Sequence, residues 1–264
     1  MKDLCADVLA EYTQLAALAG TLTPRQWVQK TPFYDWTPWD EIAHLCYFDQ
    51  TGMLAATDPE AFAAETAELM KQLGNGLDIN AIARARFGHL GGARIVPHWQ
   101  QLFERLIGAL SGMEPKARLP WYGPTLSVRS FATARMMETW AHGQDICNCI
   151  GERRPVSDRI KNIAHLGVST FSWTFINRNL PVPEPAPYIE LQAPSGESWI
   201  WNDPPSEHHY LRGSAEDFCL VVTRRRNVAD TRLQYAGSAT EWLPIAQCFA
   251  GPPEDAPAPG ERAV

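Results

Sequence analysis

One segment of the chain, residues 127–150, carries ionisable side chains in a pattern suited to binding a metal ion. If the segment is a helix, four of them fall within an arc of about 80°: Arg135, Glu138, His142 and Asp145. Glu138 and His142 are four residues apart, so their heads converge on one point, as two ligands of one metal do. The rest of the segment is apolar on several sides, which predicts burial, and a buried charged stripe is costly unless its groups pair or bind a metal. Two ion pairs, Arg135–Glu138 and His142–Asp145, are the alternative interpretation.

A metal site on this segment needs a third ligand from another part of the chain. The other histidines are the first candidates: His44, His89, His98, His165, His208 and His209. Helical spacing does not select His44, because it lies beside Asp40 and Phe48 rather than in the centre of an apolar stripe. A structural histidine at a helix–helix contact is the alternative there. The residues alone leave the third ligand open.

The first half of the chain is expected to supply helices that position these residues. Apolar spacing, Thr-Pro and Asp-Pro starts and glycine stops predict the boundaries. The expected helices span residues 2–18, a segment opening at Thr23-Pro24, 37–54, 58–74, 79–110, 127–150 and 157–177.

The second half changes character after a proline-rich linker at residues 181–187. Strands at 188–191 and 198–201 flank a Pro-Ser-Gly turn and predict a hairpin. A short helix at 217–225, a strand at 232–235 and a final helix at 241–249 are expected to follow. Residues 251–264 are rich in Pro, Ala, Gly and charge, which predicts a disordered tail.

Composition limits the class of protein. The chain has 264 residues, 45% of them hydrophobic, and a net charge of −7, which argues against a nucleic-acid partner. We expect no signal peptide and no membrane span. The six cysteines form no CxxC pair, so reduced thiols and a cytoplasmic location are expected.

Two motifs resemble the mycothiol-dependent maleylpyruvate isomerase family of the DinB-like superfamily. The first is Trp36-Thr37-Pro38-Trp39-Asp40 with His44-Leu45, and the second is Glu138-Thr139-Trp140-Ala141-His142-Gly143-Gln144-Asp145-Ile146. The second half also resembles that family around residues 194–199 and 213–226. Within the family, the chain is more similar to a branch of metal-binding proteins than to the isomerase itself.

The resemblance implies an α+β fold. A DinB-like four-helix bundle would span residues 1–152, and a helix with a small, sterol-carrier-like α/β domain would span 153–250. It also implies that His44, Glu138 and His142 are the three metal ligands. Zn²⁺ suits two histidines and a carboxylate best, and Fe, Ni, Co or Mn are accepted by the same set.

The resemblance further implies a low-molecular-weight thiol as co-substrate and a small-molecule substrate, in a monomer or homodimer. The candidate catalytic residues are His165, Asp145, which would orient an imidazole, and Arg84, with Arg86 and Arg94 as further cationic candidates. Arg178 and Trp121 are the candidates for binding the cofactor. The segments 121–124 and 165–178 are aromatic-rich, which favours a more apolar pocket than a small dicarboxylate requires.

Three functions are consistent with these residues. The first is a thiol-dependent isomerase or S-transferase acting on an electrophilic metabolite. The second is a metalloenzyme that uses metal-bound water without a thiol. The third is a non-catalytic protein that binds a metal and an apolar ligand.

Overall fold

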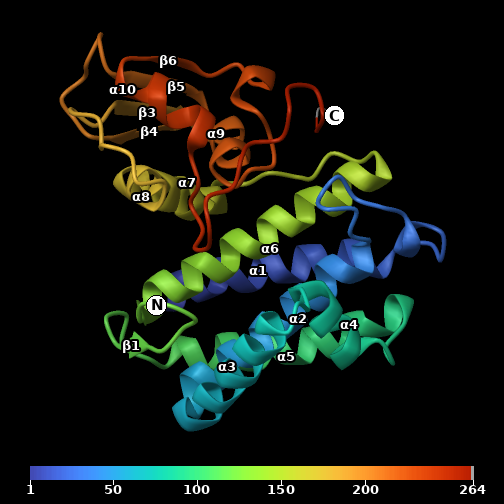
Figure 1. Ribbon diagram of the computed structural model, residues 1–264. Helices are drawn as coiled ribbons and strands as arrows, with labels where there is room; N and C mark the ends of the chain where they lie inside the picture. Colours follow the sequence, from blue (N-terminus) through green and yellow to red (C-terminus); the bar gives the residue numbers. More distant parts are fainter. Residues whose placement is uncertain (263–264) are drawn as a thin grey trace. The chain divides into compact units, whose positions relative to one another are not determined.

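The computed structural model describes residues 1–262. The chain divides into two compact units, Met1–Glu152 and Arg153–Val264. The first unit is helical apart from one short strand pair, and the second carries a four-stranded sheet (Figure 1). The expected α+β class is therefore confirmed. Within residues 1–262, no helix has the length and apolarity needed to cross a bilayer.

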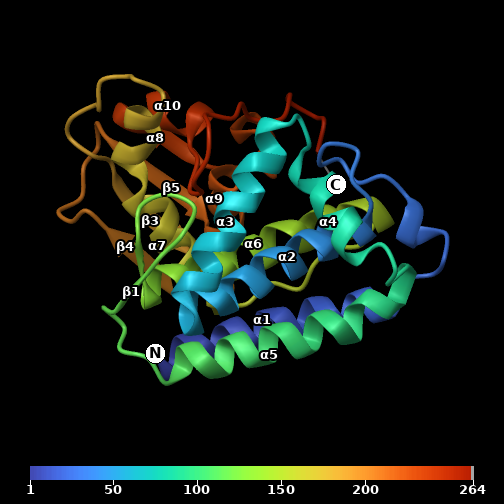
Figure 2. The same cartoon turned by 60° about the horizontal axis from the view of Figure 1, so that its bottom comes forward.

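Four long helices form the bundle of the first unit. They are α1 (Lys2–Gly20), α2 (Pro38–Thr57), α5 (Ile95–Ser111) and α6 (Val128–Ile150). Both α1 and α2 pack against α5 and α6, and α1 and α5 run side by side in Figure 2. Large side chains such as Trp99, Phe103 and Phe131 are fully buried between them. The four-helix bundle is thus confirmed.

The two helices that carry the metal-site candidates begin at clear capping residues. Thr37 accepts a hydrogen bond from the Asp40 amide at 3.3 Å, and the Asp40 carboxylate accepts one from the Thr37 amide at 2.8 Å. Pro38 occupies the first turn of α2. Ser127 caps α6 by accepting from the Ser130 amide at 3.0 Å.

Shorter elements complete the first unit. They are η1 (Gln26–Val28), α3 (Pro59–Gly74), α4 (Ile79–Phe87), η2 (Gly92–Arg94), β1 (Arg118–Leu119) and β2 (Leu126–Ser127). The single helix expected over 79–110 is wrong, because the chain turns at Gly88 and again at Gly91-Gly92, where Gly92 has a φ of 58°. The start at Thr23-Pro24 gives only the one-turn η1.

The second unit contains a mixed sheet covered by helices. Its strands are β3 (Tyr188–Gln192), β4 (Ser198–Trp201), β5 (Tyr210–Ser214) and β6 (Gln234–Ala236), in the order β4-β3-β5-β6. The pair β3–β5 is parallel and the other two pairs are antiparallel. Its helices are η3 (Asp158–Ile160), α7 (Lys161–Ser169), α8 (Phe171–Asn177), α9 (Ala215–Val222), η4 (Val228–Asp230), α10 (Ser238–Trp242) and η5 (Leu243–Ile245).

Several expectations for the second unit need correction. The helix expected over 157–177 is divided into η3, α7 and α8; α7 and α8 meet at Thr170, whose hydroxyl donates to the Leu166 carbonyl at 2.9 Å. The final helix ends early because Pro244 follows α10. Strand β5 was not expected.

The segment expected to be a disordered tail contacts the second unit as far as residue 262. The Glu254 carbonyl accepts a hydrogen bond from Arg224 at 2.7 Å, and the Pro257 carbonyl accepts one from Asn227 at 2.8 Å. The Gly260 amide donates to Asp230 at 2.8 Å. Backbone groups of the segment thus find partners that its composition does not reveal.

Candidate metal centre

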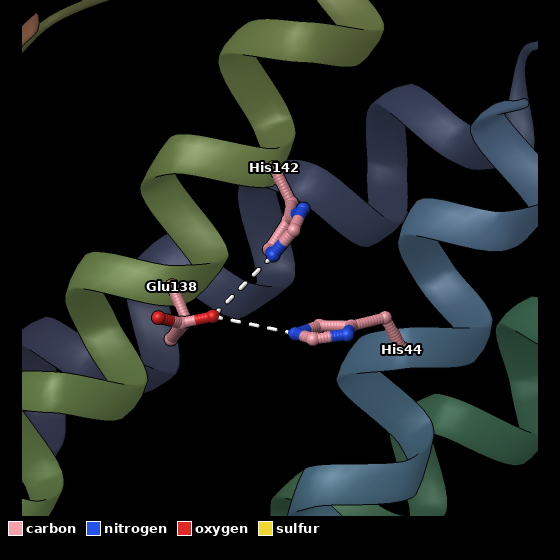
Figure 3. Close-up of side chains that lie close together, drawn as sticks. All are labelled: His44, Glu138 and His142. Atoms are coloured by element: carbon pink, nitrogen blue, oxygen red, sulfur yellow. Dashed lines mark hydrogen bonds and ion pairs between the residues drawn. The ribbon is translucent and has the colours of Figure 1, made fainter. Parts of the chain in front are cut away.

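The three side chains expected to bind a metal converge at one point of the bundle. His44 comes from α2, and Glu138 and His142 come from α6 (Figure 3). The Glu138 Oε2 atom lies 3.4 Å from His44 Nε2 and 3.3 Å from His142 Nε2. One ligand atom from each residue lies within 4.8 Å of the others. Two separate helices therefore offer two imidazole nitrogens and one carboxylate oxygen to a common centre.

The spacing of these atoms fits a divalent cation. Ligands at about 2.0–2.1 Å from a tetrahedral zinc ion lie about 3.3–3.4 Å from one another. Both distances from Glu138 Oε2 to the imidazole nitrogens fall at this value. Nitrogen and carboxylate oxygen are also the donor atoms that zinc prefers.

A buried carboxylate fixes the orientation of the His142 ring. Glu41 Oε2 lies 2.6 Å from His142 Nδ1, and both side chains are almost fully buried. Because a carboxylate accepts hydrogen bonds, the Nδ1 atom donates to Glu41, and Nε2 is the ring atom that faces Glu138. Nε2 and the Glu138 carboxylate are held together either by a proton on Nε2, which makes the ring an imidazolium, or by a cation between the two atoms. The donor set of this chain thus calls for a positive charge at its centre.

The same carboxylate takes part in a second acidic group of residues. Glu41, His142 and Asp145 are all buried, and one potential ligand atom of each lies within 4.8 Å of the others. The 2.6 Å between Glu41 and His142 is shorter than the separation of about 3 Å or more between two ligands of one ion, so this contact is a hydrogen bond. Glu41 therefore holds the ring in the way that we expected of Asp145, which lies beside it.

Glu41 is the residue that the sequence analysis missed. Its carboxylate also accepts a hydrogen bond from the Thr31 hydroxyl at 2.7 Å. It lies one turn before His44 in α2, in a helix that is otherwise largely apolar. A carboxylate on such a helix, three residues from a candidate ligand, is the signal that could have selected it.

The charge on Glu138 is favoured by its neighbours. Burial disfavours ionisation of this carboxyl, but hydrogen bonds with His142 and His44 outweigh that effect and hold its pKa well below the usual value. The Glu138 side chain remains 25% exposed, whereas that of His142 is 3% exposed. Glu138 is therefore the more solvent-exposed residue of this pair.

A second buried network supports the same two helices. Asp49 on α2 accepts hydrogen bonds from Arg135 Nε at 2.9 Å, Tyr12 at 2.7 Å and Trp99 at 2.8 Å. Burial disfavours the charged guanidinium, but Asp49 outweighs it and raises the pKa of Arg135. The alternative interpretation paired Arg135 with Glu138 and His142 with Asp145. In the structure Arg135 pairs with Asp49 and His142 with Glu41, so these buried charges of α6 have other partners.

The cationic candidates have partners away from the three ligands. Arg84 forms an ion pair with Asp40 at 2.6 Å, and its guanidinium lies 5.6 Å from the centre of the Trp39 ring. Arg86 pairs with Glu65 at 2.6 Å. Arg94 donates to the Gly91 carbonyl at 3.4 Å. The contacts of Arg84 are thus those with Asp40 and Trp39.

The remaining candidates divide between the two units. Trp121 lies in the first unit, 6.2 Å from the ring of Phe48, which in turn lies 4.7 Å from the ring of His44. His165 accepts a hydrogen bond from Trp201 at 3.2 Å. Arg178 pairs with Asp255 at 3.3 Å and donates to the Glu254 carbonyl. These contacts of His165 and Arg178 lie within the second unit.

Comparisons with known proteins found relatives in sequence and in fold. Over 250 residues, the chain is 39% identical to an uncharacterised protein of Mycobacterium tuberculosis, in strains CDC 1551 and H37Rv, covering 94% of this chain and 95% of the relative. The crystal structure of a mycothiol-dependent maleylpyruvate isomerase superimposes with a TM-score of 0.54 at 13% identity, covering 83% of this chain and 87% of the other. A histidine-to-alanine variant of that isomerase gives a TM-score of 0.52.

A family model extends the likeness to the sequence of the bundle. The mycothiol maleylpyruvate isomerase N-terminal domain matches residues 8–147, a range that contains His44, Glu138 and His142. This match covers more than half of the chain. The chain therefore belongs to the mycothiol maleylpyruvate isomerase family.

Proposed function

We propose that this chain is a divalent-metal-dependent isomerase that uses a low-molecular-weight thiol on a small electrophilic metabolite. The observation that carries the proposal is the convergence of His44, Glu138 and His142 at zinc-like spacing. Membership of a family named for a thiol-dependent isomerase supports the choice of reaction.

The number of ligands favours catalysis over a structural role. Structural zinc sites have four protein ligands, whereas catalytic sites have three and leave a position for substrate or water. When bound, a divalent cation supplies Lewis-acid chemistry and lowers the pKa of a thiol or water that reaches it. The partly exposed side of Glu138 provides the path for such a molecule.

Neighbouring residues hold the three candidate ligands in position. The Glu41 carboxylate keeps a proton of His142 on Nδ1, so that Nε2 is the nitrogen that would hold the metal. The Asp49–Arg135 pair ties α2 to α6 one turn away from the ligands, which limits movement of the two helices. The rings of Trp36 and Phe48 lie beside His44 and give that side of the centre an apolar border.

The proposed reaction changes the geometry of a conjugated double bond. The sulfur of the thiol adds to the carbon of a double bond conjugated to a carbonyl, the resulting single bond rotates, and the same sulfur leaves. The thiol is regenerated, so the net change is a cis-to-trans isomerisation.

Metal analysis of purified variants is the first test. We expect about one equivalent of metal in the wild type and loss of most of it in His44→Ala, Glu138→Ala and His142→Ala. His98→Ala is the matched control, because His98 is a partly buried histidine of α5 whose ring contacts Phe87 instead of the candidate ligands. Full metal content in all three ligand variants would contradict the proposal.

Turnover is the second test. The metal-loaded protein is incubated with mycothiol and a cis enone, and isomerisation is followed by the change in absorbance. We expect activity that requires both metal and thiol. Activity that requires the metal but no thiol would replace the proposal with a metalloenzyme that uses bound water.

A further inference from the structure

The candidate metal centre is bordered by aromatic rings. The ring of His44 lies 5.3 Å from that of Trp36 and 4.7 Å from that of Phe48. The ring of His142 lies 5.3 Å from that of Phe33 and is parallel to that of Trp36, with an interplanar angle of 6°. Phe33, Trp36 and Phe48 are all partly exposed, so apolar surface is available next to the ligands.

These rings continue into a larger aromatic surface. Phe48 contacts Trp121 at 6.2 Å and Tyr122 at 5.6 Å between ring centres. Phe62 stacks on Trp121 at 5.8 Å with an interplanar angle of 10°. Trp121 and Tyr122 belong to the loop between β1 and β2, and both are partly exposed. We call Trp36, Phe48, Trp121 and Tyr122 the aromatic wall.

The charges around the centre do not suit a dianionic substrate. Glu138 and Glu41 both lie at the ligands, and Asp145 lies beside them. Three arginines of the first unit are engaged by carboxylates: Arg84 by Asp40, Arg86 by Glu65 and Arg135 by Asp49. With one carboxylate at the metal ion, the second carboxylate of a molecule such as maleylpyruvate would meet negative charge and apolar rings here, whereas small anionic ligands need cationic partners to replace their hydration.

We infer that the substrate of this chain is an uncharged conjugated carbonyl compound with an apolar, ring-sized body that packs on the aromatic wall. This inference rests on the proposed function, because it places the reactive carbon of the substrate at the same centre. Phe48 is the specificity-determining residue, since its ring contacts both His44 and the loop that carries Trp121. Packing of a substrate ring against these side chains supplies the binding energy that ion pairs supply for a dicarboxylate.

Two substrates that share one reactive group test this inference. Each is a cis methyl enone: (Z)-4-phenylbut-3-en-2-one carries a phenyl ring on the double bond, and (Z)-4-oxopent-2-enoate carries a carboxylate. With metal and mycothiol present, we expect kcat/KM for the phenyl enone to be at least about tenfold higher. Equal values, or a preference for the carboxylate, would overturn the inference and leave the proposed function intact.

Variants of Phe48 test whether the aromatic wall causes the preference for the phenyl enone. We expect Phe48→Leu to raise KM for the phenyl enone about five- to tenfold and to change KM for the carboxylate enone less than about twofold. Phe48→Tyr keeps the ring and should keep the preference. Trp121→Leu is a second variant from a different element, should Phe48→Leu fold poorly. An equal rise in KM for both substrates, at unchanged metal content, would mean that the aromatic wall has only a structural role.

Failure of the proposed function is detected separately. If neither enone is isomerised with any thiol, the proposed function fails. Binding of the phenyl enone to the zinc-loaded protein is then measured by calorimetry, in the wild type and in Phe48→Leu. Wild-type binding that the variant weakens at least about fivefold supports an apolar ligand on the wall, and undetectable or unchanged binding refutes it.

Discussion

Replacement of Glu41 by glutamine is the sharpest test of how this chain holds a metal. The carboxylate lies 2.6 Å from His142 Nδ1, and the two side chains are 0% and 3% exposed, so solvent does not weaken their interaction. A hydrogen bond to a charged group contributes about 1.5–3 kcal/mol, and a neutral one about 0.5–1.5 kcal/mol. Glutamine keeps the acceptor and loses the charge, so the difference is about 1–2 kcal/mol, or about 5- to 30-fold in an equilibrium constant.

We therefore expect Glu41→Gln to raise the dissociation constant for zinc about 5- to 30-fold, and Glu41→Ala to raise it about 10- to 100-fold. The measurement is a competition between the protein and a chromophoric chelator of known affinity, at constant pH. Glu65→Gln is the matched control, because Glu65 is a carboxylate of the same unit that pairs with Arg86 and accepts a hydrogen bond from Tyr47.

The outcomes of this experiment distinguish the role of Glu41 from that of Asp145. The control should bind zinc as the wild type does, and Asp145→Asn should weaken binding less than Glu41→Gln does, because Glu41 already occupies the Nδ1 side of His142. An unchanged zinc affinity in Glu41→Gln would refute the reasoning. So would a larger effect of Asp145→Asn, which would return the orienting role to Asp145.

Further predictions concern stability. Asp49→Ala removes the acceptor of a buried ion pair and should lower the free energy of unfolding by about 3–5 kcal/mol, measured by urea denaturation. Arg84→Ala removes a half-exposed guanidinium, while the buried Asp40 carboxylate keeps its hydrogen bonds from Thr37, and should cost less than about 1 kcal/mol. Gly52→Ala places a Cβ 2.7 Å from the Phe131 ring and should cost about 1–3 kcal/mol in the same measurement. Deleting residues 251–264 should lower the melting temperature by calorimetry and leave the metal content unchanged, because the partners of this segment lie in the second unit. Removal of metal by a chelator should lower the melting temperature of the wild type and leave that of His142→Ala unchanged.

The sequence predicts the part of the site that lies on one helix. Glu138 and His142 are four residues apart in a segment with a clear serine cap and a glycine stop, and both the helix and the direction of the two side chains follow from local rules. His44 is selected by family resemblance alone, because no local rule relates positions on two different helices. Glu41 has a local signal, its place three residues before His44, but its partner His142 is distant in the chain, so the sequence does not show what the carboxylate contacts.

The errors in the predicted secondary structure also come from contacts between distant parts of the chain or from local breaks in a pattern. Apolar periodicity continues through residues 79–110 and favours one helix, although the glycines within the segment divide it. Strand β5 has the sequence Tyr-Leu-Arg-Gly-Ser, which has little strand character, and it forms because β3 and β6 supply hydrogen bonds on both sides.

The cap of α2 sets the rotational position of His44. Thr37 and Asp40 define where the helix begins, and each residue of an α-helix turns the next by about 100°. A single residue inserted between Asp40 and His44 would turn the imidazole away from Glu138 by more than a quarter of a circle, although every ligand would still be present in the chain. The length of this short stretch is thus as strict a requirement for the metal centre as the chemistry of its ligands, and chains of similar sequence that differ here by one residue should lack the centre.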